Sequence, residues 1–207
     1  MDKAVIGLDV DGVILDYVSG FFRFMEINGH KAHCKAHEAD DWTMKRAFPY
    51  LEVDAIWQMI ERFSEDEGFA TLKPFDGAVE TIKALIEEFP DNPLVAITSA
   101  GHSPKTREFR IRNLSWIPFS EVHVLPLGES KVEHFKRLPV GSLYVDDLKK
   151  NVDHAESVGV AGVLVRRAYN RDDNHHRVAH DWSDIASHIR EIIRKNVEHN
   201  VERAFSL

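Results

Sequence analysis

Cysteine is almost absent from this chain, because Cys34 is the only one among 207 residues. An internal disulfide is therefore excluded, and this usage fits a reducing compartment. Long apolar runs are also missing, since none approaches the roughly 20 residues that cross a bilayer. The apolar run before Asp9 is too short for the hydrophobic core of a signal peptide. We therefore expect a cytoplasmic protein that makes no contact with a membrane.

Positive charge is in deficit, with 26 lysines and arginines against 34 aspartates and glutamates and a formal net charge of -8. No basic stripe stands out, so we expect no nucleic-acid partner. A small anionic ligand remains compatible with this balance, because a metal ion and one or two cations can reverse the field inside a pocket. The length indicates one domain, or one domain with an insertion, and leaves a homodimer open.

The first apolar run, residues 5–8, leads into an acidic turn. The run shows no alternation, which is typical of a strand that is covered on both faces. Asp9 follows it directly and Asp11 lies two residues further on. Gly12 lets the backbone turn and approach a ligand closely, because glycine has no Cβ. Taken alone, the pattern is equally compatible with an ordinary Asp-Gly turn.

Apolar runs alternate with helical periods after residue 74. This alternation predicts a Rossmann-like three-layer α/β/α core with a parallel sheet. The expected strands of that core are residues 5–8, 94–97, 122–125, 142–145 and 161–165. The expected helices are residues 78–89, 105–114, 131–137, 148–157 and 181–197.

The segment 17–73 differs from the rest, because it shows helical periods at 17–27 and 53–63 and no strong strand. We therefore expect a core domain of residues 1–16 and 74–207 and a small helical cap domain of residues 17–73, which we call the cap segment. The charged stretch 170–181 is expected to be an exposed loop.

Three of the expected strands end in reactive polar residues, and a lysine opens the helix before one of them. The carboxyl ends of parallel strands lie on one edge of a sheet, so these side chains can converge. Alone, the threonine-serine pair would be a turn and the lysine a solvated helix residue; the ordered set favours a functional site. Its members are Asp9, Asp11, Thr98, Ser99, Lys131, Asp146 and Asp147.

In this order, Asp9-Val10-Asp11-Gly12-Val13, Thr98, Lys131 and Asp146-Asp147 resemble the four motifs of the haloacid dehalogenase superfamily. The resemblance covers residues 1–16 and 74–165, and the cap segment resembles the small helical cap of that superfamily's first cap class. Within the superfamily, the aromatic helix 17–27 and the pair Thr98-Ser99 are most similar to the 5′(3′)-deoxyribonucleotidase group.

The chemistry of these residues indicates phosphoryl transfer. Asp9 suits a carboxylate nucleophile that attacks phosphorus and forms an aspartyl-phosphate. Mg²⁺ would neutralise the negative charges that meet in that step. Thr98 offers a hydroxyl group to phosphate oxygens, and Lys131 places a positive charge on the transferring group.

The resemblance adds roles for the acids. It implies that Asp9 gives one oxygen to Mg²⁺ and that Asp11 gives its backbone carbonyl, which frees the Asp11 side chain for acid/base work. Superfamily members without an acid at this second position tend toward other chemistry, so Asp11 favours a phosphatase. In the fourth motif we prefer Asp147 as the direct ligand and Asp146 as a residue that orients metal-bound water.

The substrate that this resemblance favours is a nucleoside (deoxy)monophosphate. We expect Gly12 and Ser99 to contact it, and Phe21 and Trp42 to be the aromatic residues that face its base. One alternative is a phosphatase of sugar phosphates or another small metabolite. An alternative of a different class is a non-catalytic phosphate-binding or interaction protein, against which the two intact acids argue. A 3′-phosphatase of nucleic-acid ends would need a row of basic residues to bind the nucleic acid, and the net negative charge argues against that alternative.

Two other polar groups have ordinary interpretations. His30, His33, Cys34 and His37 have near-helical spacing and are candidate transition-metal ligands, but no second ligand cluster is evident and surface histidines are common. Lys105 and Arg107 follow the second motif, and we expect them on a solvated helix face.

Overall fold

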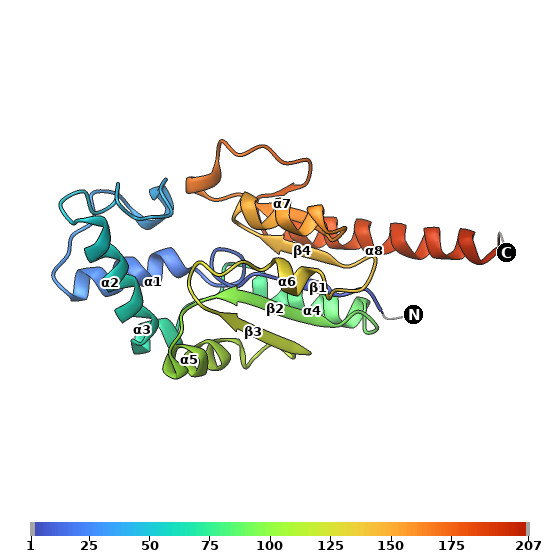
Figure 1. Cartoon of the computed structure of the whole chain (residues 1–207), viewed down its shortest axis with the longest axis horizontal. Coiled ribbons are helices and arrows are strands. Elements are labelled where there is room, and N and C mark those ends of the chain that lie inside the picture. The colour runs from blue at the N-terminus through green and yellow to red at the C-terminus, as the bar shows by residue number, and fades with distance from the viewer. Residues whose placement is uncertain (1–2, 206–207) are drawn as a thin grey trace.

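The computed structural model describes the backbone of residues 3–205 and the side chains of residues 3–196. In this part of the chain, six parallel strands form one sheet in the order β3-β2-β1-β4-β5-β6. The predicted Rossmann-like parallel sheet is therefore confirmed (Figure 1). Its strands are β1 (Ile6–Leu8), β2 (Leu94–Ser99), β3 (Glu121–Leu125), β4 (Leu143–Asp146), β5 (Ala161–Val165) and β6 (Val178–Ala179).

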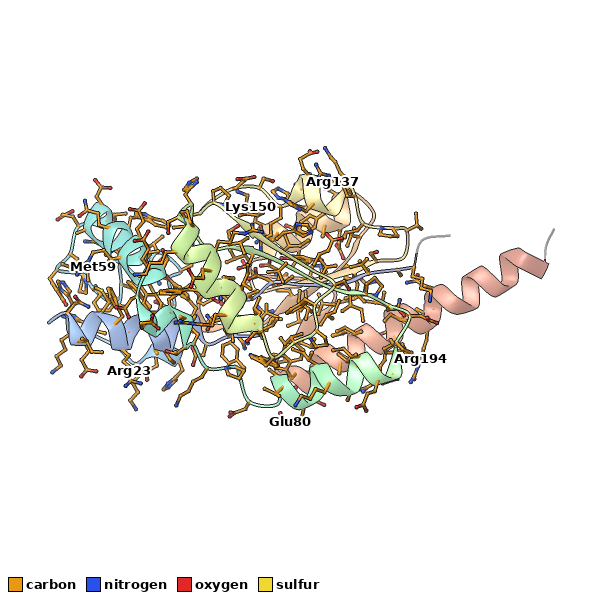
Figure 2. The ribbon with its side chains drawn as sticks, turned by 90° about the horizontal axis from the view of Figure 1, so that it is seen from below. Arg23, Met59, Glu80, Arg137, Lys150 and Arg194 are labelled. Carbon is orange, nitrogen blue, oxygen red and sulfur yellow. The ribbon has the colours of Figure 1, made fainter. Side chains whose placement is uncertain are left out.

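Helices cover both faces of the sheet, because successive strand residues point to opposite sides and both sides are apolar. Leu8, Ala96 and Val145 belong to one buried cluster, whereas Ile97 and Tyr144 belong to another. The helices on the first face are α4 (Ala78–Glu88), α5 (Pro104–Leu114) and α8 (Trp182–Phe205). Those on the second face are α6 (Val132–Phe135) and α7 (Lys149–Ser157). Figure 2 shows α4, which carries Glu80, beside α8, which carries Arg194.

The cap segment begins directly beyond the carboxyl end of β1. Its helices are α1 (Tyr17–Ile27), η1 (Ala36–Glu38), α2 (Val53–Ser64) and α3 (Glu67–Ala70). Asp16 starts α1 by accepting a hydrogen bond from the Ser19 amide at 3.1 Å. Figure 1 shows α1 to α3 gathered at one end of the sheet, while α8 extends past the other end.

The two connections between the cap segment and the core lie side by side. The Asp16 amide donates to the Lys73 carbonyl at 2.9 Å, and the Phe75 amide donates to the Ile14 carbonyl at 2.9 Å. Inside the cap segment, the Phe63 ring is surrounded by other aromatic rings, with Phe24 at 5.2 Å and Phe21 at 5.7 Å between centroids. Apolar burial therefore holds these helices together, although the division into two domains stays a prediction.

One stretch was predicted wrongly. Residues 170–181 are not simply an exposed loop, because they contain strand β6, and Asn170 and Ala179 are buried. A strand of two residues carries no period, and its pairing of Ala179 with Val165 is a long-range contact. Within residues 3–205, no helix combines the length and the apolar character needed to cross a membrane.

Candidate active site

Asp9 lies at the centre of the sheet, immediately after β1. The neighbours of β1 are β2 and β4, so the residues that follow these three strands meet at one edge. The Asp9 amide donates to the Val145 carbonyl at 2.8 Å, which continues the pairing of β1 with β4 for one more residue. The Asp9 side chain is buried at the point where the sheet ends.

Lys131 is a buried cation that joins three groups from two strands. Its Nζ atom donates to Asp9 Oδ1 at 2.7 Å and to Asp146 Oδ2 at 2.8 Å. It also donates to the Tyr144 hydroxyl at 2.9 Å, and that hydroxyl donates to the Ile97 carbonyl at 2.8 Å. The predicted lysine is thus brought to the acids, on the turn that starts α6.

The acids are too crowded to ionise freely. Burial raises the pKa of Asp9 to about 7; Lys131 opposes this shift, and Asp146 adds to it. Burial, Asp146 and Asp9 likewise raise the pKa of Asp147 well above its usual range. Burial alone would lower the pKa of Lys131, but Asp146 and Asp9 raise it overall, so the ammonium stays charged. The cluster therefore carries a surplus of acid over base.

Asp146 and Asp147 have different surroundings. Asp146 accepts from the Leu148 amide at 2.8 Å and from Asn151 Nδ2 at 3.0 Å, in addition to Lys131. Asp147 Oδ2 instead accepts from the Tyr169 hydroxyl. Asp146 is thus held by fixed donors on both oxygens, whereas fewer groups hold Asp147.

A short 3-10 helix after β5, η2 (Ala168–Asn170), completes this side of the site. Tyr169 donates to Asp147, and Asn170 Nδ2 donates to the Asp147 carbonyl at 2.6 Å. Arg167 Nε donates to the Gly12 carbonyl at 2.7 Å. These three residues were not predicted, because they follow an unremarkable strand end and only the fold places them here.

Gly12 occupies a position that a side chain cannot share. Its φ is +78°, in the left-handed region, and an added Cβ would overlap the Asp147 carboxylate and contact the Tyr169 hydroxyl. The close approach in the structure is to Asp147, and contact of Gly12 with a ligand stays a prediction.

The Asp11 side chain is paired with an arginine that sequence reasoning missed. Arg110 Nη2 donates to Asp11 Oδ2, and the Arg110 side chain is 0% exposed. Its guanidinium lies 4.4 Å from the centroid of the Phe69 ring in the cap segment. The sequence carries little signal for it, because the buried face of α5 mixes polar and apolar residues while Ile111 on the same helix is exposed. That face consists of Thr106, Phe109, Arg110, Asn113 and Leu114.

Several buried polar atoms at this edge make no hydrogen bond to any described residue. They include Thr98 Oγ1, Asp11 Oδ1 and two further nitrogens of Arg110. Buried polar groups are normally paired, so unpaired ones at this edge mark where a ligand, an ion or water can bind. Thr98 is buried at the end of β2, with Ser99 half-buried beside it.

The carboxylates suit a divalent cation. Asp9, Asp146 and Asp147 each place one oxygen within 4.8 Å of the others. Hard cations such as Mg²⁺ prefer oxygen ligands of this kind, and a dication would offset the surplus acid. The donor set therefore fits the predicted metal.

The predicted aromatic contacts have different outcomes. Phe21 is 0% exposed and packs against Phe48 and Phe63 in the interior of the cap segment. Trp42 is 55% exposed and packs edge-on against Trp57 at 5.9 Å between centroids. Lys105 and Arg107 are exposed, as expected for a solvated helix face.

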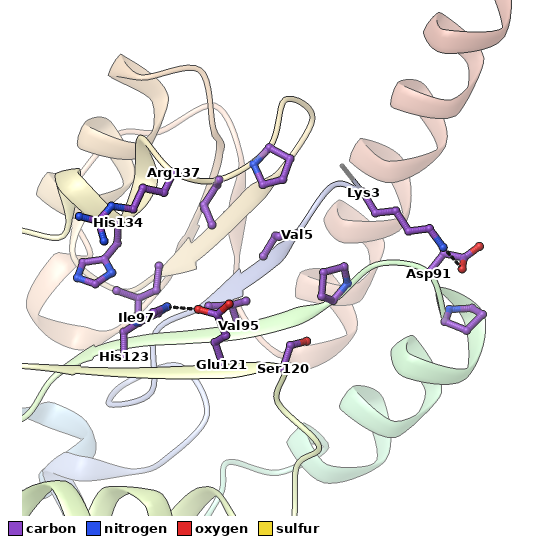
Figure 3. Close-up of a pocket in the computed structure, with 14 residues that line it drawn as sticks. Lys3, Val5, Asp91, Val95, Ile97, Ser120, Glu121, His123, His134 and Arg137 are labelled. Carbon is purple, nitrogen blue, oxygen red and sulfur yellow. Dashed lines mark hydrogen bonds and ion pairs between the residues drawn. The ribbon is translucent and has the colours of Figure 1, made fainter. Parts of the chain in front are cut away.

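His30 and His33 pack around Tyr50, and among the side chains of residues 3–196 neither they nor Cys34 nor His37 belong to a group that could hold a metal ion. A hollow of about 720 Å³ lies elsewhere, between the sheet and α6, and is lined by Lys3, His123, His134 and Arg137 among others (Figure 3). It contains none of the acids described above.

The sheet order and the acids at the ends of β1 and β4 define a fold of the haloacid dehalogenase type. The structure resembles protein tyrosine kinase A of Mycobacterium tuberculosis with a TM-score of 0.66 and 19% identity, over 93% of this chain and 98% of that one. It resembles the haloacid dehalogenase-like hydrolase SP0104 of Streptococcus pneumoniae with a TM-score of 0.64 and 14% identity, over 91% and 99% of the two chains. At such identities the likeness shows the fold alone.

The sequence also matches one particular family that has this fold. Residues 3–196 match the family described as 5′ nucleotidase, deoxy (pyrimidine), cytosolic type C protein, and the chain belongs to this family. The predicted resemblance to a deoxyribonucleotidase-like phosphatase is thereby confirmed. An uncharacterized 32.4 kDa protein of Enterobacteria phage T4 is 27% identical over 164 residues, which are 75% of this chain. The match spans only 58% of that phage protein.

Proposed function

We propose that this protein hydrolyses phosphomonoesters with Mg²⁺, through an aspartyl-phosphate on Asp9, and that its substrates are nucleoside (deoxy)monophosphates. The observation that carries the proposal is the single Lys131 ammonium within 2.8 Å of both Asp9 and Asp146. This geometry fixes one Asp9 oxygen and leaves the carboxylate at the edge where Thr98 and Asp11 also lie. A nucleophile with a fixed orientation and a nearby cation is what in-line attack on a phosphate requires.

In the first step, an Asp9 oxygen attacks phosphorus, the bond from phosphorus to the ester oxygen breaks, and Asp11 gives its proton to that oxygen. In the second step, water attacks the same phosphorus while Asp11 takes a proton from it. The bond from phosphorus to Asp9 then breaks, and inorganic phosphate is released. Lys131 and the Thr98 hydroxyl contact the phosphoryl oxygens in both steps.

Asp9, Asp147 and the Asp11 backbone carbonyl would hold the metal, with Asp146 as a supporting acid. When bound, Mg²⁺ supplies positive charge that neutralises the phosphate and the acids. Asp146 is better suited to support than to direct ligation, because its oxygens already accept from Lys131, Leu148 and Asn151. Among the described residues, only the Tyr169 hydroxyl donates a hydrogen bond to the Asp147 carboxylate. Asp147 is therefore the better direct ligand.

The family's description, which names deoxy pyrimidine 5′ nucleotides, supports a nucleotide substrate. Trp42 is exposed and is the aromatic side chain that we propose stacks on a base, whereas the buried Phe21 supports the packing of the cap segment. Gly12 and Ser99 stay proposed contacts of the phosphate. A small metabolite as the only partner and a cytoplasmic location belong to the same proposal, and sedimentation would decide between monomer and homodimer.

A panel of phosphate esters tests the proposal. We expect phosphate release from nucleoside monophosphates with Mg²⁺, loss of release with EDTA, and a loss of at least about a thousandfold in Asp9→Asn. Acid quenching during turnover should trap phosphate on the peptide that contains Asp9. Full activity of Asp9→Asn would refute the nucleophile, whatever the substrate.

The same panel separates the alternatives. A much higher kcat/KM for sugar phosphates would replace the nucleotide assignment with a metabolite phosphatase. Phosphate binding without turnover of any ester would indicate a non-catalytic protein that keeps the fold. Trp42→Ala should raise KM for nucleotides but leave KM for p-nitrophenyl phosphate unchanged. Tyr50→Ala removes another half-exposed aromatic of the cap segment and should leave both KM values unchanged.

A further inference from the structure

A second group of ligating side chains lies at the opposite edge of the sheet from Asp9. Glu156 is in the last turn of α7, and His175 and His176 precede the edge strand β6. One ligand atom of each residue lies within 4.8 Å of the others. Glu156 lies near the start of β5, where the Gly162 amide donates to its Oε1 at 3.3 Å, whereas Asp146 pairs with Leu164 toward the end of that strand.

His175 has a buried nitrogen whose nearest acid, Glu156, is too poorly aligned to form a hydrogen bond with it. Its side chain is 4% exposed, and its Nε2 atom is buried without a hydrogen-bond partner. On the other side of the ring, Nδ1 lies 2.9 Å from the Arg177 carbonyl oxygen, to which it can donate, and 3.1 Å from the Arg177 amide nitrogen, from which it can accept. With the proton on Nδ1, that carbonyl fixes the ring and leaves the Nε2 lone pair directed at the Glu156 carboxylate. Backbone carbonyls orient metal-binding histidines in this way.

Each histidine lies from one oxygen of Glu156 at the spacing of neighbouring ligands in a tetrahedral metal site. His175 Nε2 is 3.4 Å from Glu156 Oε2, and His176 Nε2 is 3.3 Å from Glu156 Oε1. Around zinc, with bonds of about 2.0–2.2 Å, neighbouring ligand atoms are separated by about 3.4 Å. Two imidazoles and one carboxylate suit zinc and similar borderline cations, whereas Mg²⁺ prefers oxygen ligands throughout.

We propose that Glu156, His175 and His176 form a binding site for Zn²⁺ or a similar divalent transition-metal ion, distinct from the site of Asp9. The site is structural: it ties the segment after β5 to α7. Near the start of that segment, Tyr169 and Asn170 donate hydrogen bonds to Asp147. The two histidines lie at its end. A metal at its far end therefore restrains the loop that supports the proposed catalytic edge.

Arg177 occupies part of this site in the structure. Its Nη1 atom donates to His176 Nε2 at 2.7 Å and to Glu156 Oε1 at 3.2 Å. The guanidinium thus supplies positive charge where the metal would lie, and acceptance of its proton leaves His176 Nε2 unprotonated, as a metal ligand must be. The Arg177 side chain is 29% exposed, so it can turn toward solvent when a metal enters.

Cobalt provides a direct probe. Metal-free protein is first saturated with Mg²⁺, which fills the oxygen-ligand site, and is then titrated with Co²⁺. Four-coordinate Co²⁺ with imidazole ligands absorbs visible light far more strongly than six-coordinate Co²⁺ with oxygen ligands. We expect this strong absorption to saturate at one equivalent and to disappear when Zn²⁺ is added. Zn²⁺ should also raise Tm by a few degrees in the presence of Mg²⁺.

Variants locate the absorption. His176→Ala and Glu156→Gln should remove the strong bands, while His180→Ala, which removes an exposed histidine four residues away, should keep them. Asp9→Asn should also keep them, because it alters only the other site. Arg177→Ala should tighten Co²⁺ binding several-fold, since a competing cation is gone.

The readouts do not depend on His175 variants, which can unfold the protein because this side chain is buried. The absence of strong visible absorption in wild type and in Arg177→Ala would overturn the proposal. So would bands that persist in both His176→Ala and Glu156→Gln. In either case the group is only a set of ion pairs between Glu156 and its neighbours.

Discussion

A single lysine sets the charge of the proposed catalytic edge. Lys131 contacts both Asp9 and Asp146, and all three side chains are buried. Burial raises the pKa of Asp9 and one cation cannot balance the neighbouring acids, so the metal-free protein retains a proton on Asp9 up to about pH 7. Buried charges without partners destabilise a fold strongly. The residues thus favour catalysis at some expense of stability.

The stability of the metal-free protein should report this proton. The pKa of Asp9 is 3.8 in an ordinary environment and about 7 in the folded chain. Between these values the folded state binds more protons than the unfolded state, so the contribution of Asp9 to stability falls as pH rises. In EDTA, Asp9→Asn should therefore gain Tm relative to wild type by several degrees between pH 5 and pH 7.5. Asp172→Asn, at an exposed acid, serves as the control; a flat difference for Asp9→Asn would contradict the raised pKa.

Arg110 positions the proposed acid/base residue. It donates to Asp11 and stacks on Phe69, so its planar guanidinium is held on two sides. Lysine offers neither the planar shape nor the fork of donors. The fold therefore orients the Asp11 side chain through a residue outside the four motifs.

Removal of this support should lower the rate more than the affinity. We expect Arg110→Met to lower kcat by about 10- to 100-fold with a small change in KM, because Asp11 loses its orienting donor. Arg110→Lys should not restore the rate. Arg112→Met, on the same helix but with a half-exposed side chain paired to Glu67, is the matched control. Equal rates for the Arg110 and Arg112 variants would count against the positioning role, and the pH profile of kcat should shift only in the Arg110 variants.

At the scale of elements, the turn after β1 links the sheet to the cap segment. The Ile14 and Leu15 amides both donate to the Val10 carbonyl, at 2.8 and 2.9 Å. The tight turn brings the Gly12 backbone under Asp147 and Arg167. The same element therefore places Asp9, Asp11 and the start of α1.

Two glycines with the same backbone conformation allow this turn to be tested. Gly12 and Gly29 have φ values of +78° and +84°, but an added Cβ meets nothing within 4 Å at Gly29. Each alanine variant should lose about 1–2 kcal/mol of stability from the left-handed backbone. Only Gly12→Ala should also lose most of its phosphatase activity, because its Cβ displaces Asp147. Comparable activity in the two variants would show that the close approach is unimportant.

At the scale of the whole molecule, the cap segment and the core are joined near the site by few polar contacts. Ser64 and Thr106 share a buried hydrogen bond of 3.1 Å, and Asn113 Nδ2 donates to the Phe69 carbonyl at 2.5 Å. Arg171, from the segment after β5, reaches Asp40 at 3.0 Å, but exposed ion pairs stabilise little. The cap segment is thus seated on α5 and on that segment.

Metal binding should stabilise the whole protein, because it offsets the buried acids. At Mg²⁺ concentrations about 100 times Kd, the gain is about 2.7 kcal/mol, which corresponds to several degrees in Tm. Thermal unfolding with Mg²⁺ and with EDTA measures it. The shift should vanish in Asp147→Asn and persist in Glu80→Gln, at the exposed acid on α4 (Figure 2). A full shift in Asp147→Asn would exclude this aspartate as a direct ligand.

Local patterns determined most of the architecture. The apolar runs predicted β1 to β5, and the period of residues 17–27 predicted α1 with its bounds, because burial on both faces and burial on one stripe leave distinct signatures. The ordered set of Asp9, Thr98, Lys131 and Asp146-Asp147 could be placed on one edge, since parallel strands align their ends. These inferences need only neighbours in the sequence and one rule of topology.

Tertiary structure alone decided the partners of those residues. β6 has two residues and forms only because Val165 lies beside Ala179. Arg110 pairs with Asp11 across 99 positions, and Tyr169 meets Asp147 because η2 folds back over the sheet edge. An aromatic residue on a helix can equally contact a substrate or fill the core, and Phe21 lies in the interior. Such contacts depend on how distant segments pack, and a periodic pattern carries information only about which face of its own element is buried.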